Sequence, residues 1–222
     1  MAIGGWILAA LMAAALGWLG RPIMVLLPES PDAAPSSPSP ISISRTPNLG
    51  WWLAGAAFVQ TGILAVTVPI HLLPAWIVVC GVGTWLAYID WHLRVLPTRI
   101  VAPLAVLVAF VVLIEAWLVA DVWIFLRAML AGALAVGVFW GLWWLAERRR
   151  PGSFGFGDVR FAAPLGVALG SLGPWAAPVG LYLAFVVGAV LGLVLKSRGR
   201  AESFAFGPAM LAGAVIGAML AA

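Results

Sequence analysis

Residues 100–119 read IVAPLAVLVAFVVLIEAWLV, an apolar run with a single ionisable side chain, Glu115. About 20 apolar residues are enough to cross the hydrocarbon core of a bilayer as a helix, and by this criterion the chain contains about eight such runs. The runs lack the alternation of a membrane β-strand. The sequence therefore predicts an all-α fold, a polytopic membrane helical bundle. The expected spans are 3–20, 50–69, 72–89, 100–119, 122–146, 159–173, 175–195 and 205–221.

The composition points to the same class of protein. Hydrophobic residues make up 64% of the chain and charged residues 9%, whereas a soluble domain has roughly 25% charged residues. The 13 Trp residues are typical of membrane proteins, because indole rings favour the membrane–water interface. So few charged side chains cannot cover a surface that faces water, and membrane lipid is the expected solvent.

The cationic residues predict an orientation. Of the 12 Lys and Arg residues, all except Arg127 fall on one side of the membrane if the odd-numbered spans run inward. Loops rich in Lys and Arg stay in the cytoplasm, so this side is expected to be cytoplasmic. The net charge of +4 is thereby explained by topology, and no nucleic acid is expected as a partner.

Three segments are expected along the chain. Residues 1–27 contain the first transmembrane helix and its cytoplasmic end, 28–49 form a Pro- and Ser-rich cytoplasmic linker, and 50–222 form a seven-helix membrane domain. No cation precedes the first apolar run, so we interpret it as a retained helix and not as a cleaved signal. Cys80 is the only cysteine, which excludes an internal disulfide and a cysteine metal site. No metal and no cofactor are expected.

Two of the acidic residues could carry chemistry together. Asp90 closes the third expected span and Asp158 opens the sixth, so the predicted topology puts both at the cytoplasmic membrane edge. Two carboxylates in contact share a proton, and such a pair can activate water while it polarises a carbonyl. Simpler explanations are a salt bridge from Asp90 to Arg94 and an N-cap role for Asp158. Two further candidates are Glu115, because ionisable groups at membrane depth are often functional, and His92.

Two glycines precede the second aspartate in the stretch GFGDVR at 155–160. Gly155 and Gly157 permit unusual dihedral angles and a close backbone approach, and would fix the direction in which Asp158 points. Arg160 follows as a membrane anchor or as a ligand for lipid phosphate or an acidic substrate residue. A phosphate-binding loop would need Lys followed by Ser or Thr, and this stretch has neither.

These motifs resemble those of one known family. GFGDVR at 155–160 resembles the GxGD signature of the type IV prepilin peptidases, in which a basic residue commonly follows two positions after the aspartate. YID at 88–90, followed by LPTR at 96–99, is similar to the first-aspartate segment of that family. FAFGPA at 204–209 resembles its late Phe-Gly-Pro element, so the resemblance covers most of the chain after residue 50.

The resemblance implies a hydrolase of the bacterial inner (plasma) membrane, an aspartic endopeptidase with Asp90 and Asp158 as catalytic residues. Gly155, Gly157 and Arg160 would support them. The substrates would be type IV prepilins or the pseudopilins of protein secretion, which lose a short basic leader at the cytoplasmic face. Many members carry a zinc-binding insert with CxxC pairs after the first helix, associated with N-methylation. The corresponding residues 28–47 have no cysteine, so neither zinc nor methyltransferase activity is expected.

Three other functions stay open. A presenilin or signal-peptide-peptidase relative also uses GxGD and would cut within a transmembrane helix of its substrate. A proton-coupled membrane transporter would use the two aspartates as a relay, although transporter sites lie near the bilayer midplane and these aspartates are predicted at the membrane edge. A structural membrane subunit would use both residues only as helix caps.

Overall fold

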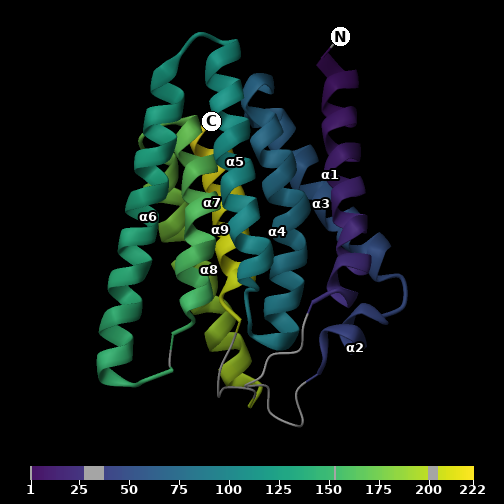
Figure 1. Ribbon diagram of the computed structural model, residues 1–222, viewed down its shortest axis with the longest axis vertical. Coiled ribbons are helices and arrows are strands. Elements are labelled where there is room, and N and C mark those ends of the chain that lie inside the picture. The colour runs from purple at the N-terminus through teal and green to yellow at the C-terminus, as the bar shows by residue number, and fades with distance from the viewer. Residues whose placement is uncertain (1, 28–37, 153, 200–204) are drawn as a thin grey trace.

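The computed structural model describes residues 2–27, 38–152, 154–199 and 205–222, and these residues form helices and no strands (Figure 1). The prediction of an all-α membrane bundle is confirmed. The first part of the expected linker, 28–37, lies outside the described residues, as do Arg200 and Phe204. The helices are α1 (Ala2–Val25), α2 (Pro40–Ser44), α3 (Leu49–Thr67), η1 (Ile70–Leu72), α4 (Leu73–Leu93), α5 (Thr98–Leu118), α6 (Val122–Arg149), α7 (Phe156–Leu172), α8 (Ala176–Ser197) and α9 (Gly207–Ala221).

Fewer helices than expected are long and apolar enough to cross a membrane. Within the described part of the chain, six candidate spans meet that criterion, formed by α1, α3, η1 with α4, α5, α6 and α8. The other two expected spans correspond to α7 with 17 residues and α9 with 15. α7 stops at Leu172 because Gly173 follows with φ of 152°, a conformation that glycine adopts most readily. The chain is thus a multi-pass membrane protein with two shorter helices packed among the longer ones.

The bundle is arranged around α4 and α7 (Figure 1). α4 contacts α1, α3, α5, α7 and α9, and α7 contacts α5, α6, α8 and α9. The contact between α6 and α7 is close because α7 has glycine where it crosses its neighbour: a Cβ on Gly166 would lie 2.9 Å from the carbonyl oxygen of Ala131. Small residues at such crossings let helix backbones approach each other in lipid. These contacts fix the two helices that carry Asp90 and Asp158.

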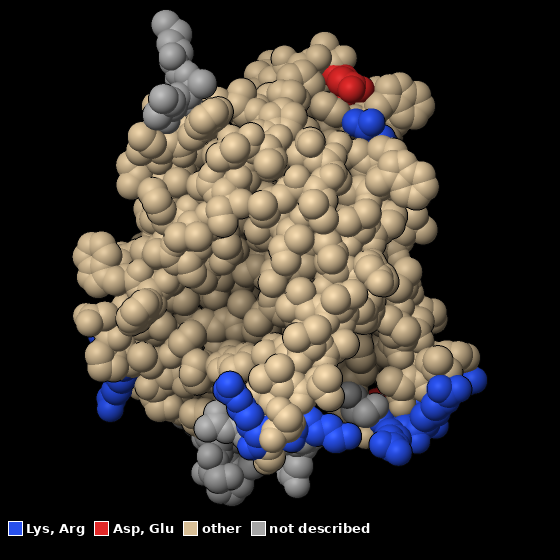
Figure 2. All heavy atoms as spheres, turned by 180° about the vertical axis from the view of Figure 1, so that it is seen from behind, with Lys and Arg blue, Asp and Glu red and all other residues tan. Residues whose placement is uncertain are grey.

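Lys and Arg side chains gather at one end of the bundle (Figure 2). This is the end at which α4, α6 and α8 finish and α5, α7 and α9 begin (Figure 1), and we call it the cation-rich end. Arg127, near the start of α6, lies toward the opposite end. Both chain termini also lie toward that opposite end (Figure 1).

The second half of the expected linker contains a short helix, α2. Ser39 caps it by accepting a hydrogen bond from the backbone N–H of Ser42, and Pro40 occupies the first turn. Both are favoured choices at those positions. The helix is attached to α4 because the Tyr88 hydroxyl lies 2.8 Å from Thr46 Oγ1 and 3.3 Å from the carbonyl oxygen of Ile43. The linker is therefore folded against the bundle where it approaches α3.

Glu115 caps a neighbouring helix. Its side chain is buried, and Oε1 accepts a hydrogen bond of 2.9 Å from the backbone N–H of Ala75 in the first turn of α4. The first N–H groups of a helix have no partner inside the helix. The Glu115 side chain accepts a hydrogen bond from one of these N–H groups, which lipid acyl chains could not do. This contact gives Glu115 a structural role far from the cation-rich end.

Removal of this cap is expected to destabilise the fold. The variant Glu115→Leu should lower the free energy of unfolding by about 1–2 kcal/mol, the usual cost of losing a helix cap. Glu115→Gln keeps an acceptor oxygen and should lose less. Thermal unfolding of both purified variants in detergent micelles measures the difference. Equal stability of the Leu variant and the unmodified protein would contradict the capping role.

Candidate functional site

Asp90 lies in the last turn of α4 and is buried. The helix continues to Leu93, so Asp90 does not end it as the sequence had predicted. The helix closes with Arg94 in a left-handed conformation, and the backbone N–H of Arg94 donates to the carbonyl oxygen of Asp90. The carboxylate of Asp90 accepts a 2.7 Å hydrogen bond from the backbone N–H of Gly207. A backbone group from a distant helix thus binds this carboxylate, in place of the salt bridge with Arg94 that was the alternative explanation.

Gly207 begins α9, within the Phe-Gly-Pro element of the sequence. A Cβ at this position would lie 2.8 Å from Asp90 Oδ2, a distance too short for a carbon–oxygen contact. The carboxylate also lies at the N-terminal end of α9, where the helix dipole favours a negative charge. The position of Asp90 near the end of its own helix is unfavourable for the same reason, and the start of α9 offsets it.

Asp158 lies in the first turn of α7 and is buried. Gly155 is the N-cap residue, so the alternative explanation of Asp158 as an N-cap does not hold. Gly155 leaves space for the carboxylate, because a Cβ there would lie 3.2 Å from Asp158 Oδ2. Gly157 leaves space for Leu96, whose Cβ would lie 2.8 Å from a Cβ on Gly157. Both glycines therefore permit close contacts around Asp158.

The two carboxylates lie near each other although they are far apart in the chain. α4 and α7 are in contact, and the charge of Asp90 acts on Asp158. Leu96 lies between α4 and α5, so its contact with Gly157 brings the start of α7 against the segment that follows Asp90. Both residues belong to the cation-rich end. The bundle thus has two buried carboxylates at that end, on two helices that contact each other.

Arg160 connects two helix starts. Its guanidinium group donates to the hydroxyl of Thr98, the first residue of α5, and lies 4.7 Å above the ring of Phe156. These contacts join the first turn of α7 to that of α5. They offer a role for the cation that the sequence did not suggest, in addition to a membrane anchor.

His92 belongs to α4 and not to the following loop. Its Nδ1 lies 2.9 Å from the carbonyl oxygen of Tyr88, one turn earlier, and its ring lies 4.3 Å from the Tyr88 ring. His92 thus contacts its own helix. Among the described residues no three His, Cys, Asp or Glu side chains form a group that could hold a metal ion.

Four phenylalanines connect the segments that precede α7 and α9, the two helices that begin at the site. The ring of Phe206, next to Gly207, lies 6.5 Å from that of Phe154, next to Gly155. Phe139 of α6 lies 6.1 Å from Phe206 and 6.2 Å from Phe154, and Phe185 of α8 completes the cluster. The sequence alone does not predict this cluster. The one signal available was a Phe immediately before a Gly in both segments.

Fold and site together define a class of protein: a polytopic membrane bundle with a buried carboxylate pair at its cation-rich end. The chain belongs to the type IV leader peptidase family, whose model matches residues 76–195. That range includes both Asp90 and Asp158 and ends before Gly207.

Individual relatives are similar to part of the chain. Two proteins named prepilin leader peptidase/N-methyltransferase, from Burkholderia pseudomallei strains 1026b and K96243, are each 40% identical to it over 94 residues. The match covers 40% of this chain and 29% of the length of each relative. No solved structure matches the chain.

Proposed function

We propose that this protein is a prepilin peptidase, a membrane aspartic endopeptidase that removes the short leader of type IV prepilins or pseudopilins. The observation that carries the proposal is the pair of buried carboxylates, Asp90 and Asp158, on two helices that belong to the matched family region. The names of the Burkholderia relatives support the substrate class. Peptidase activity alone is proposed here, and the N-methyltransferase activity in those names is not extended to this chain.

The chemistry follows from two carboxylates that share one proton. The ionised carboxylate takes a proton from a water molecule, and the oxygen of that water attacks the carbonyl carbon of the scissile peptide bond. The protonated carboxyl donates a hydrogen bond to the carbonyl oxygen, where negative charge develops. Collapse of the tetrahedral intermediate breaks the C–N bond, and the leaving nitrogen receives a proton from the pair. Neither a metal ion nor a covalent enzyme intermediate takes part in this sequence of steps.

Each supporting residue has a separate task in this proposal. The N–H of Gly207 holds the Asp90 carboxylate at the start of α9. Gly155 and Gly157 leave the space that Asp158 needs next to the segment after α4. Arg160 holds the first turn of α7 against α5 through Thr98. All three tasks concern position, because two catalytic groups must keep a fixed geometry to act on one bond.

The cation-rich end indicates which side of the membrane carries the site. Lys and Arg are retained in the cytoplasm, so we propose that the protein lies in the bacterial inner membrane with the carboxylate pair at the cytoplasmic face. The leader of a prepilin precedes an apolar helix, and a cut at that face would release the leader into the cytoplasm while the helix remains in the membrane.

The position of the cut tests this function. The full-length protein, reconstituted in lipid vesicles with a tagged prepilin, is expected to produce one cleavage, between the leader and the apolar helix, as determined by mass spectrometry. A cut inside the apolar helix would favour a presenilin-like protease instead. Proton-coupled flux with no cleaved product would favour a transporter and overturn the proposal.

A further inference from the structure

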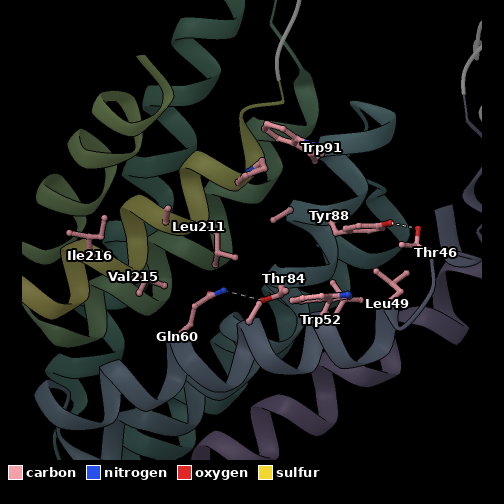
Figure 3. Close-up of a pocket in the computed structure, with 15 residues that line it drawn as sticks. Thr46, Leu49, Trp52, Gln60, Thr84, Tyr88, Trp91, Leu211, Val215 and Ile216 are labelled. Atoms are coloured by element: carbon pink, nitrogen blue, oxygen red, sulfur yellow. Dashed lines mark hydrogen bonds between the residues drawn. The ribbon is translucent and has the colours of Figure 1, made fainter. Parts of the chain in front are cut away.

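The helix α9, whose start binds Asp90, is packed closely on one face only. A groove of about 580 Å³ is lined by α3, α4 and α9, and Leu211 and Val215 line it from α9 (Figure 3). On another face α9 lies directly against α8, where a Cβ on Gly213 would overlap the backbone of Ala184. Since the groove leaves the first side without close packing, the position of the first turn of α9 depends on its other neighbours.

One of these neighbours is a glycine of α8 that lies against the ring of Phe206. Gly188 is buried, and a Cβ at this position would overlap the Phe206 ring. Phe185 is three residues earlier and hence on the same face of α8, and its ring centroid lies 5.5 Å from that of Phe206. Glycine inside a helix costs stability relative to alanine, and here it admits the ring. α8 thus holds Phe206 between Gly188 and Phe185.

Phe206 carries the peptide group that binds Asp90. The peptide unit between Phe206 and Gly207 is planar, so the N–H of Gly207 moves with the Cα of Phe206. This N–H donates the 2.7 Å hydrogen bond to the Asp90 carboxylate. Pro208 follows in the first turn of α9, where its ring fixes φ. A shift of Phe206 that moves its Cα therefore moves the hydrogen-bond donor of Asp90.

The same rings reach the turn that carries Asp158. Phe154 precedes Gly155, whose carbonyl oxygen accepts a 3.2 Å hydrogen bond from the backbone N–H of Asp158. The Phe154 ring lies 6.5 Å from Phe206 and 6.2 Å from Phe139, and Phe139, which is fully buried, lies 6.1 Å from Phe206. These centroid distances are within the range of favourable aromatic pairs. The starts of α7 and α9 are thus joined through their preceding phenylalanines.

We propose that this phenylalanine cluster positions the two carboxylates relative to each other, Asp90 through Gly207 and Asp158 through Gly155. The cluster consists of Phe139, Phe154, Phe185 and Phe206, with Gly188 as the position that admits the Phe206 ring. This inference rests on the function proposed above, because two groups that act on one bond need a fixed geometry. Close-packed rings cannot shift one at a time, so the cluster transmits a displacement at one helix start to the other. Its members are positioning residues and not catalytic residues.

The variant Gly188→Ala tests the proposal, with Gly180→Ala as its control. Each adds one methyl group at a buried glycine of α8 and presses it against a side chain: the Phe206 ring in one case, and Leu169 Cδ1 at 2.6 Å in the other. Gly180 lies near the start of α8, at the opposite end from the carboxylates. Gly188→Ala is expected to lower kcat for a tagged prepilin in lipid vesicles by about tenfold or more, since a misplacement of about 1 Å can cost about 10²-fold. Gly180→Ala should keep its kcat.

The Michaelis constant and the unfolding temperature separate positioning from packing. Gly188 is buried and does not contact the substrate, so KM should change little while kcat falls. Both alanine variants introduce a similar overlap and should unfold at similar temperatures. An equal fall in kcat in both variants, or an unchanged kcat in Gly188→Ala, would overturn the proposal.

Phe154 provides a second test, which decides the matter even if Gly188→Ala does not fold. Phe154 is only partly buried, so its replacement perturbs the core less. Phe154→Leu removes the ring and should lower kcat, whereas Phe154→Tyr keeps the ring and should recover most of it. In the double variant with Gly188→Ala, the loss in kcat should be smaller than the product of the single losses, because both changes act on one cluster. Equal kcat in the Leu and Tyr variants, or fully multiplicative losses, would overturn the proposal.

Failure of the cluster and failure of the proposed function give different results. If Asp90→Asn is inactive while Gly188→Ala and Phe154→Leu keep the kcat of the unmodified protein, the peptidase function stands and the role of the cluster is wrong. If Asp90→Asn still cleaves the prepilin, the proposed catalytic pair itself is wrong.

Discussion

Replacement of either Asp90 or Asp158 by asparagine is expected to abolish leader removal from a co-expressed prepilin. Asparagine has nearly the same shape as aspartate but can neither take a proton from water nor share one with its neighbour. Proton transfer by a positioned side chain typically contributes about 10²–10⁴-fold to the rate, so a loss of this order is expected for each variant. Gel mobility of the precursor and of the mature pilin measures the fraction cleaved.

The matched control for these variants is Asp121→Asn. Asp121 caps α6 through a 2.9 Å hydrogen bond to the backbone N–H of Trp123, at the opposite end from the carboxylate pair. Asparagine is as good an N-cap as aspartate, so leader removal should be unchanged. All three variants should be recovered from the membrane in equal amounts. Normal cleavage by either Asp90→Asn or Asp158→Asn would contradict the catalytic role of that residue.

The sequence predicts the class of fold because one physical requirement dominates it. Backbone groups in lipid must be paired within the same segment, so the apolar run at 100–119 has to be helical, and α5 (Thr98–Leu118) agrees with the expectation within two residues. The ends of helices are less predictable, because hydropathy does not distinguish helix from loop where polar residues begin. α4 continues through Asp90 to Leu93 for that reason.

The short helices show a second limit of hydropathy. α7 begins at Phe156, three residues before the expected span, because Gly155 caps it and Asp158 favours the first turn of a helix. Its length of 17 residues leaves it out of the candidate spans. The role of α7 in the bundle depends on its packing with α4, α5, α6, α8 and α9, which an apolar run cannot indicate.

The candidate site is only partly readable from the sequence. The aspartates and the glycines of GFGDVR could be singled out, because the residue types and their predicted depth limit the choice. The hydrogen bond from Gly207 to Asp90 could not, since it joins two residues that are far apart in the chain.

The substitution Gly207→Ala is expected to reduce kcat by about 10²-fold, the scale expected when a catalytic group moves by about 1 Å. A Cβ would lie 2.8 Å from Asp90 Oδ2, so either the start of α9 or the carboxylate must move, and the 2.7 Å hydrogen bond between them is weakened or lost. The change adds one methyl group beside Asp90 and removes no side chain, so KM for the prepilin should change little. The measurement is the separate determination of kcat and KM with the purified protein in vesicles.

The control is Gly137→Ala, a change of the same size on α6, where a Cβ would meet no atom within 4 Å. Alanine favours the helix over glycine, so this variant should keep its activity and its thermal stability. Gly207→Ala should also unfold near the temperature of the unmodified protein, because its defect is confined to the contact with Asp90. A general loss of packing would instead lower the unfolding temperature and raise KM together with the fall in kcat, and that pattern would count against Gly207 as the residue that positions Asp90. Unchanged kcat in Gly207→Ala would show that the carboxylate does not need this N–H to act.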